Sequence, residues 1–218
     1  MTNDPAISRS VLADQVKDRL LQDILSGRYP SRSRIVETRV ARELGTSQAP
    51  VREALRGLEG LGLIEILPFR GARVRHPSRS ELLEAYAVRA ELEALGARLG
   101  VPRMTEGDLV EIEALLAVME RAADGGDRHE VALADATFHG RLLQLAGNAT
   151  LGRVWRSLEP FSRTYITLVA PGADSHWTAG LHPAIVDALR TRDPELVVAA
   201  LRSHFDRASA HLAEGWQD

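Results

Sequence analysis

Four side chains in the C-terminal half of the chain have the types and spacing of a metal site. Asp135 and His139 are four residues apart, so on a helix they lie one turn apart on the same face. His182 falls near the start of a later expected helix, and His204 in the middle of the last one. Three imidazoles and one carboxylate suit a divalent transition metal, with zinc as first choice and nickel or manganese as alternatives.

The spacing alone does not establish this site. Each histidine could instead be a separate residue of a helix surface or of the core, and the spacing by itself favours that interpretation. If the four side chains do converge, open metal positions could activate water, so a metal-dependent hydrolase is one candidate function. Against it, no further carboxylate or histidine has a convincing spacing for a general base.

A second group of residues has the types that contact DNA. Ser47 is a good N-cap for a helix that begins at about Gln48, and Gln48, Arg52 and Arg56 follow at intervals of four on one face. Glutamine can pair with adenine, and arginine with guanine or a phosphate. An ordinary solvated helix face is the alternative. The apolar positions that would pack this helix are Val51, Ala54, Leu55 and Leu58.

Charge and composition separate the two groups. Residues 1–76 carry 13 basic and 9 acidic side chains, whereas the remainder carries 14 and 21. A basic N-terminal unit is expected of a DNA-binding domain, because phosphate neutralisation supplies most non-specific affinity.

The chain has no cysteine, which excludes disulfides and thiolate metal sites. No stretch approaches the roughly 18 apolar residues of a membrane span, so we expect a soluble, cytoplasmic protein with no membrane partner.

The N-terminal elements should form a winged helix-turn-helix. Periodicity predicts helices at about residues 11–25, 37–44 and from 48 onward, with Gly45 in the tight turn between the second and third. Short strands at about 63–67 and 72–75 then form a hairpin. Its tip carries Arg70 and Gly71, which could contact the minor groove or the DNA backbone.

Beyond a polar linker, the chain is predicted to be helical throughout. Thr105 followed by Asp108 has the pattern of a capping box. Short connections between helices favour an antiparallel bundle. The expected domains are 1–76, a linker at 77–79, and a bundle over 80–218. About six helices are expected in that bundle, at 80–100, 106–123, 128–146, 149–170, 178–190 and 194–215.

The N-terminal motifs resemble those of the GntR family of bacterial transcription regulators. The segments that carry the resemblance are Gly45-Thr-Ser-Gln-Ala-Pro-Val-Arg-Glu-Ala-Leu55, Leu58-Glu-Gly-Leu-Gly-Leu63 and Arg70-Gly-Ala-Arg-Val74. Members of the family usually have arginine at the position of Gln48. This difference affects which bases the chain would prefer in its operator.

The C-terminal segments resemble the all-helical FCD-type effector domain of the FadR subgroup. They are Tyr86–Glu93, Asp135–His139, Gly147-Asn148, His182–Asp193 and Arg202-Ser-His204. Many FCD domains bind a metal through one Asp and three His, and the resemblance places these ligands at Asp135, His139, His182 and His204. It also implies that Arg89 holds an effector carboxylate and that Asn148 lies near the pocket. From spacing alone, Arg89 and Glu93 would be a surface ion pair, and Asn148 a helix cap.

Together these features predict a transcription regulator and not an enzyme. We expect a homodimer, most simply a repressor, that binds a near-palindromic double-stranded operator and responds to a small carboxylate effector at the metal site. A repressor whose signal is the metal itself is the alternative within the same class.

Overall fold

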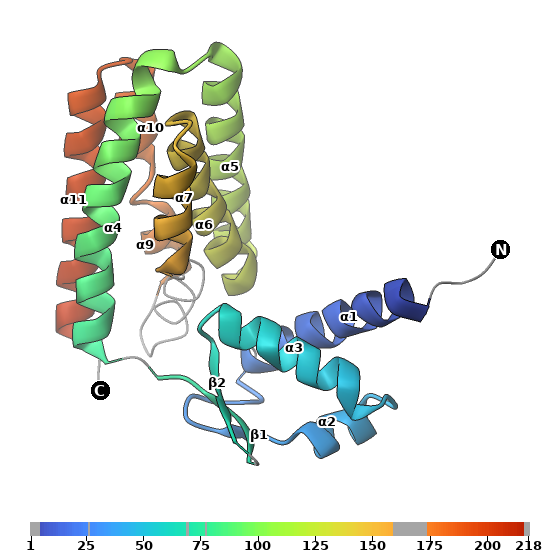
Figure 1. Cartoon of the computed structure of the whole chain (residues 1–218). Coiled ribbons are helices and arrows are strands. Elements are labelled where there is room, and N and C mark those ends of the chain that lie inside the picture. Colours follow the sequence, from blue (N-terminus) through green and yellow to red (C-terminus); the bar gives the residue numbers. More distant parts are fainter. Residues whose placement is uncertain (1–4, 26, 69, 77, 159–173, 216–218) are drawn as a thin grey trace. The chain divides into compact units, whose positions relative to one another are not determined.

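The computed structural model describes residues 5–25, 27–68, 70–76, 78–158 and 174–215. The chain divides into two compact units, Met1–His76 and Pro77–Asp218, and each has its own hydrophobic core. Helices dominate both units, and every strand of the described residues belongs to the first (Figure 1). The predicted fold class, a mainly α chain with a winged helix-turn-helix followed by a helical bundle, is confirmed.

The described residues of the first unit form three helices and a three-stranded antiparallel sheet in the order β1-β3-β2. Buried aliphatic side chains from α1, β1 and α3 form its core, among them Leu20, Ile35, Val51 and Leu58. Apolar residues at three- and four-residue intervals place this face of α3 inward and leave its polar face in solvent. The elements are α1 (Pro5–Leu25), β1 (Arg34–Ile35), α2 (Glu37–Glu43), α3 (Gln48–Gly60), β2 (Ile64–Leu67) and β3 (Gly71–Val74).

The turn between α2 and α3 agrees with prediction in its backbone but not in its cap. Gly45 has φ +63°, the left-handed conformation that glycine adopts without steric cost. Ser47 occupies the N-cap position, yet its hydroxyl accepts no hydrogen bond from the helix. The third helical residue is Pro50, which has no N–H to donate, so half of the usual capping partners are missing. The predicted side-chain cap is therefore wrong.

The wing contains a strand that the sequence analysis missed. β1 pairs with β3 through Arg34 opposite Arg73 and Ile35 opposite Ala72. Two residues are too few to show the alternation by which a strand is recognised. Gly71 begins β3 at φ +83°, and a Cβ added there would lie 2.4 Å from the carbonyl oxygen of Ile35. Only glycine permits this approach of β3 to β1.

We predict that Gly71→Ala destabilises the first unit. The new methyl group must push β1 away and also adopt a left-handed backbone, a strain of about 1–3 kcal/mol. Urea unfolding followed by circular dichroism measures the loss. Gly60→Ala is the matched control, because a Cβ at Gly60 meets no atom within 4 Å and its φ is not positive. Equal midpoints for the two variants would contradict the prediction.

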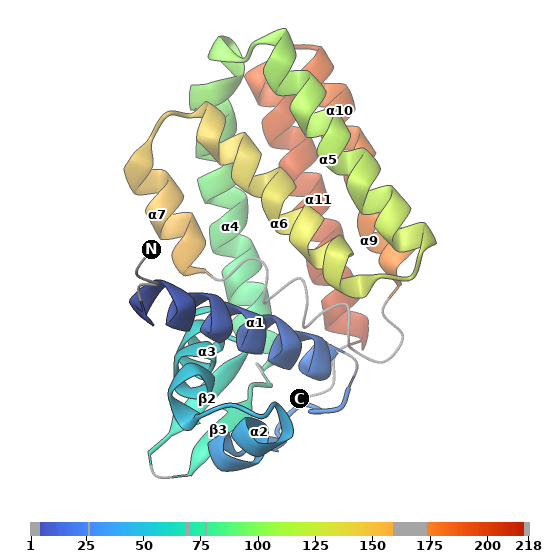
Figure 2. The same cartoon turned by 90° about the vertical axis from the view of Figure 1, so that its right-hand side faces the viewer.

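The second unit is a helical bundle. α4 packs along α11, and α5 packs along α6 (Figures 1 and 2). Its elements are α4 (Arg79–Gly100), a 3₁₀ turn η1 (Val101–Arg103), α5 (Glu106–Asp124), α6 (Arg128–Leu145), α7 (Ala149–Ser157), α9 (Ser175–Ala179), α10 (Pro183–Arg190) and α11 (Pro194–Gly215). Among the described residues, no helix is long and apolar enough to cross a membrane.

Helix caps explain several boundaries of the bundle. The capping box of Thr105 and Asp108 at the start of α5 is confirmed. Hydrogen bonds from Thr105 and from the Arg141 guanidinium lower the pKa of Asp108 to about 2, so this cap stays ionised in ordinary buffers. Ser78, placed in the expected linker, caps α4 by accepting from the amide of Glu81 at 3.2 Å.

Two predicted helices differ from the structure. The helix expected over 178–190 is two helices, because Pro183 cannot continue a preceding helix and instead takes the first position of α10. The break makes His182 the N-cap residue of α10. The helix expected over 149–170 is described only as α7, since residues 159–173 lie outside the described part of the chain.

Candidate metal centre and nucleic-acid interface

The structure brings the four predicted metal ligands together inside the bundle. Asp135 and His139 come from α6, His182 from the start of α10 and His204 from α11, and all four are buried. The Nε2 atom of His182 lies 3.2 Å from Nε2 of His139 and 3.2 Å from Oδ1 of Asp135. One ring nitrogen from each of the three histidines can be chosen so that all lie within 4.8 Å of one another.

Hydrogen bonds behind the centre determine which nitrogens face it. Nδ1 of His182 is 3.0 Å from the carbonyl oxygen of Thr178. A carbonyl can only accept, so this nitrogen carries the proton and Nε2 presents its lone pair to the centre. Nδ1 of His139 is likewise 2.5 Å from Oε2 of Glu93. Metal-binding histidines usually have such outer partners.

The resulting centre needs a positive charge. With both outer nitrogens protonated, Nε2 of His139, Nε2 of His182 and Oδ1 of Asp135 are all acceptors that face one another. Three lone pairs at this separation repel unless a proton or a cation lies among them. Nδ1 of His204 is also buried, and no described residue hydrogen-bonds to it. An unpaired buried nitrogen beside three acceptors fits a transition-metal ion.

The ionisation of the site suits a metal. Burial would raise the pKa of Asp135. When a proton takes the place of the metal on the facing imidazoles, the hydrogen bond from His182 and the positive charges of His139 and His182 outweigh burial, and the pKa of Asp135 lies below its usual range. Burial lowers the pKa of His204 well below its ordinary value, and His182 and His139 lower it further. A carboxylate and a neutral imidazole are the forms that bind metals.

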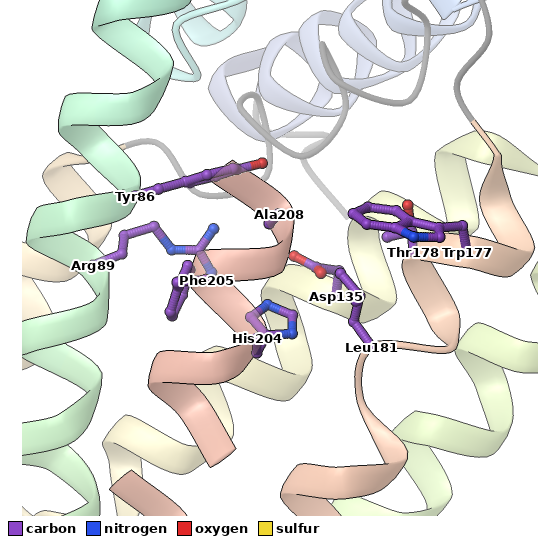
Figure 3. Close-up of a pocket in the computed structure, with 9 residues that line it drawn as sticks. All are labelled: Tyr86, Arg89, Asp135, Trp177, Thr178, Leu181, His204, Phe205 and Ala208. Carbon is purple, nitrogen blue, oxygen red and sulfur yellow. The ribbon is translucent and has the colours of Figure 1, made fainter. Parts of the chain in front are cut away.

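A small cavity of about 30 Å³, partly open to solvent, lies against one side of the centre. Asp135 and His204 form part of its wall, and the guanidinium of Arg89 points into the same space (Figure 3). Phe205 and Tyr86 supply apolar wall. The full lining is Tyr86, Arg89, Asp135, Trp177, Thr178, Leu181, His204, Phe205 and Ala208.

Arg89 and Glu93 are a buried pair, so the surface ion pair considered from spacing alone is wrong. Their side chains are 2% and 0% exposed. Nε of Arg89 donates to Oε1 of Glu93 at 3.2 Å. Nη2 lies 3.2 Å from the same oxygen but makes no hydrogen bond within the described part of the chain. The unsatisfied Nη2 is a buried donor that a ligand in the cavity could use. The guanidinium also lies 5.1 Å from the ring centre of Phe205.

Other candidate residues lie apart from the centre. Asn148 is exposed and caps α7, accepting from the amides of Thr150 and Leu151 at 3.1 and 3.0 Å. It does not line the cavity, so its position supports the capping role. His176 is exposed beside Asp124, and His211 stacks on Trp177 at 4.2 Å, outside the cluster of three histidines. Phe161 and Tyr165, two aromatic residues that the sequence suggests for the core or the pocket wall, lie outside the described residues.

Sequence reasoning missed the outer shell of the centre. Glu93 was noted only as a partner of Arg89, and Thr178 was not considered, because a backbone carbonyl leaves no trace in side-chain types. One clue was available for Glu93. It lies on α4 between the buried positions Leu82 and Ala97, where an acidic residue is rare without a partner.

The polar face of α3 is exposed as predicted. Gln48, Arg52 and Arg56 all reach solvent. Arg52 forms an ion pair of 3.1 Å with Glu37 at the start of α2, and Arg56 one of 2.8 Å with Glu53. At the N-cap, Ser47 is exposed as well.

At the tip of the wing, Arg70 is exposed, and its carbonyl accepts a hydrogen bond from Nε of Arg34 at 2.5 Å. Arg34 therefore joins Arg70 on the wing, a second arginine that sequence reasoning missed. Gly71 follows in the close approach of β3 to β1 described above. Its structural role does not depend on contact with DNA.

Comparison with known proteins agrees with both halves of this description. Residues 12–74 match the family model "Bacterial regulatory proteins, gntR family", and residues 84–207 match the FCD domain. The chain is 37% identical to a probable D-xylose utilization operon transcriptional repressor of Paenarthrobacter nicotinovorans, over 96% of this chain and 93% of that protein. It is 26% identical to the gluconate operon transcriptional repressor of Bacillus licheniformis, over 96% and 88%.

Among solved structures, a putative GntR regulator from Rhodococcus sp. RHA1 has a similar fold. Its TM-score is 0.75 at 23% identity, with 94% of this chain and 99% of that one covered. These relatives are regulators of transcription, which removes the metal-dependent hydrolase considered from the four ligands alone. With a family model covering each unit and a relative similar along almost its whole length, the chain belongs to the GntR family of bacterial transcription regulators, in the group whose C-terminal domain is of the FCD type.

Proposed function

We propose that this regulator is a repressor that binds a near-palindromic operator as a homodimer in the cytoplasm and is controlled by a small carboxylate at a metal centre. The observation that carries the proposal is the convergence of Asp135, His139, His182 and His204 beside a cavity into which a buried arginine points. The winged helix-turn-helix supplies the DNA-binding surface, and the FCD domain supplies the control.

The metal would be held by one carboxylate and three imidazoles, and zinc, nickel and manganese all accept this ligand set. The chemistry it supplies is that of a Lewis acid for the oxygen of an anionic ligand. The chain's own contribution is orientation, since Thr178 and Glu93 fix two of the imidazoles. Without the metal ion, the Asp135 carboxylate and the acceptor nitrogens of the imidazoles would face one another with no positive charge among them.

The effector would bind in the adjoining cavity. Arg89 offers a buried guanidinium that lines the cavity, and its Nη2 makes no hydrogen bond within the described residues; such a donor suits a carboxylate oxygen. The relatives named for D-xylose and gluconate operons make sugar-derived acids the first compounds to screen. Tyr86 and Trp177 line the cavity and supply flat walls for the carbon chain.

Control would follow from a population shift. A ligand changes the affinity for DNA only by its different affinity for the two arrangements of the protein, and couplings of about 1–3 kcal/mol are typical. Relief of repression corresponds to an effector that prefers the arrangement with weaker DNA binding. In a two-fold dimer, the separation of the two α3 helices sets the half-site spacing in the operator.

The deciding experiment measures operator binding by fluorescence anisotropy with zinc alone and with zinc plus each acid of a panel. Our proposal expects zinc alone to leave DNA binding in place and one acid to weaken it by about 5–150-fold, the range of typical couplings. A metal sensor would instead switch completely on zinc addition, with no acid required. An absence of any response to metal or acid would contradict both.

Arg89→Lys tests the role of the arginine. Lysine keeps the charge opposite Glu93 but loses the planar fork, so we predict normal zinc content and at least tenfold weaker binding of the responsive acid, measured by calorimetry. Arg202→Lys is the control, because Arg202 makes an exposed pair with Glu91 at 3.1 Å. Unchanged acid affinity in Arg89→Lys would remove Arg89 from the effector site.

A further inference from the structure

Glu93 makes contacts that a simple ion pair with Arg89 does not require. Its two oxygens have partners on three helices. Oε1 accepts from Nε of Arg89 on its own helix, and from Nε1 of Trp155 on α7 at 2.7 Å. Oε2 faces Nδ1 of His139 on α6 at 2.5 Å. One carboxylate thus touches a metal ligand, the effector arginine and a separate helix.

The position of Glu93 also controls which atom of His139 is used. A carboxylate that accepts from Nδ1 keeps the proton on that nitrogen and aims Nε2 at His182 and Asp135. Without this acceptor, the imidazole could take the other tautomer, whose Nε2–H would point into the centre. Glu93 therefore acts on the metal through His139, and on the cavity through Arg89.

The contact with Trp155 extends this arrangement to α7. Trp155 is buried and packs with Leu143, Ala146 and Leu151. Its ring lies 5.6 Å from the guanidinium of Arg89. Because Glu93 contacts His139, Arg89 and Trp155 together, a change in the position of His139 or Arg89 must alter the hydrogen bonds of Glu93, and Trp155 shares the oxygen that Arg89 uses.

We propose that Glu93 is the positioning residue that couples the two ligand sites of this domain, holding His139 for the metal and Arg89 for the carboxylate and transmitting their occupancy to α7 through Trp155. The inference rests on the proposed metal centre. It adds a residue outside the four ligands, and it makes α7 an element whose environment depends on the metal.

Glu93→Gln is the test, because the amide has the same shape but cannot satisfy all the partners of the carboxylate. The NH₂ group of the glutamine can only donate, so either Nδ1–H of His139 or the N–H donors of Trp155 and Arg89 lose their acceptor. We expect zinc to bind 10–100-fold more weakly, measured by competition with a chromophoric chelator. Glu91→Gln is the matched control, since Glu91 is on the same helix but exposed; it should match the wild type.

Tryptophan emission provides a readout that a purely structural role would not change. In a Trp177→Phe, Trp216→Phe background, Trp155 is the one remaining tryptophan of the three in the sequence. Zinc should change its emission with the same midpoint as zinc binding. In the same background with Glu93→Gln, saturating zinc should leave the emission unchanged. Equal zinc affinity and an equal emission change in the Glu93→Gln protein would overturn the proposal.

Two further outcomes are informative. If Glu93→Gln does not fold, ¹⁵N-histidine NMR of the zinc-loaded wild type decides the question: protonated Nδ1 and zinc-bound Nε2 at His139, assigned with His139→Ala, support the proposal, and the reverse overturns it. If the wild type binds neither zinc, nickel nor manganese, the metal centre and the role of Glu93 both fail. If the wild type binds metal and the Glu93→Gln variant has the same zinc affinity and emission change, only the role of Glu93 is contradicted, and the metal centre stands.

Discussion

His204→Ala should abolish tight metal binding. If the apparent binding free energy of a zinc site, about 10–16 kcal/mol, is shared among four ligands, each contributes about 3 kcal/mol, so one deletion weakens binding more than a hundredfold. The wild type should contain about one metal per chain by elemental mass spectrometry after dialysis, and the variant essentially none. His139→Ala should behave in the same way, because its Nε2 faces the same centre.

The chain supplies matched controls for this experiment. His176 is exposed, and His211 stacks on Trp177 away from the centre. His176→Ala and His211→Ala remove one histidine each and should keep the metal. Loss of metal in these controls, or retention in His204→Ala, would place the site elsewhere.

Metal removal should also lower thermal stability. A ligand at 100 times its dissociation constant stabilises the folded state by about 2.7 kcal/mol. For a chain of this length, that corresponds to a fall in Tm of about 5–10 °C on chelation. His204→Ala should show no such fall, since it has no metal to lose. This comparison separates the chelator's effect on the site from any general effect.

The fold was predictable because its elements have strong local patterns. The stripe of Val51, Ala54, Leu55 and Leu58 defines α3, and the Thr105 and Asp108 pair marks the start of α5. Where prediction failed, the cause was a contact distant in sequence or a single backbone feature. β1 exists because Arg34 and Ile35 meet Arg73 and Ala72, and two residues have no periodicity.

In the candidate site, the metal ligands could be predicted but the residues that orient them could not. Its four metal ligands were placed by resemblance, since spacing alone favoured separate histidines. The groups that orient these ligands could not be recognised from their residue types. Thr178 acts through its backbone, and the break at Pro183 that sets His182 at the start of α10 was missed. Glu93 looked like half of a surface pair until three helices were folded around it.

Arg52→Ala should cause the largest loss of operator binding among the substitutions on α3. Arg52 is exposed on the polar face of the helix that begins at the helix-turn-helix turn, and it is not among the buried residues of that helix. Loss of a base contact costs about 1–3 kcal/mol, which corresponds to roughly 5–150-fold in affinity. Anisotropy titrations with operator and with scrambled DNA measure the loss and its sequence dependence.

The salt dependence distinguishes the two kinds of contact that Arg52 can make. If Arg52 contacts a base, the scrambled DNA should bind nearly as before, and the slope of log K against log salt should change little. If it contacts a phosphate, both DNAs should bind more weakly and the slope should fall by about one. Unchanged operator binding would remove Arg52 from the interface.

Glu37→Gln tests how Arg52 is held. Glu37 on α2 pairs with Arg52 at 3.1 Å, so in free protein the ion pair limits the arginine to few orientations. If this orientation is the bound one, Glu37→Gln should weaken operator binding by a few-fold, less than Arg52→Ala. If Arg52 must leave Glu37 to reach DNA, removing the carboxylate frees a cation and strengthens binding. Since an exposed pair contributes only about 0.2–1 kcal/mol, a change above tenfold in either direction would contradict both arrangements.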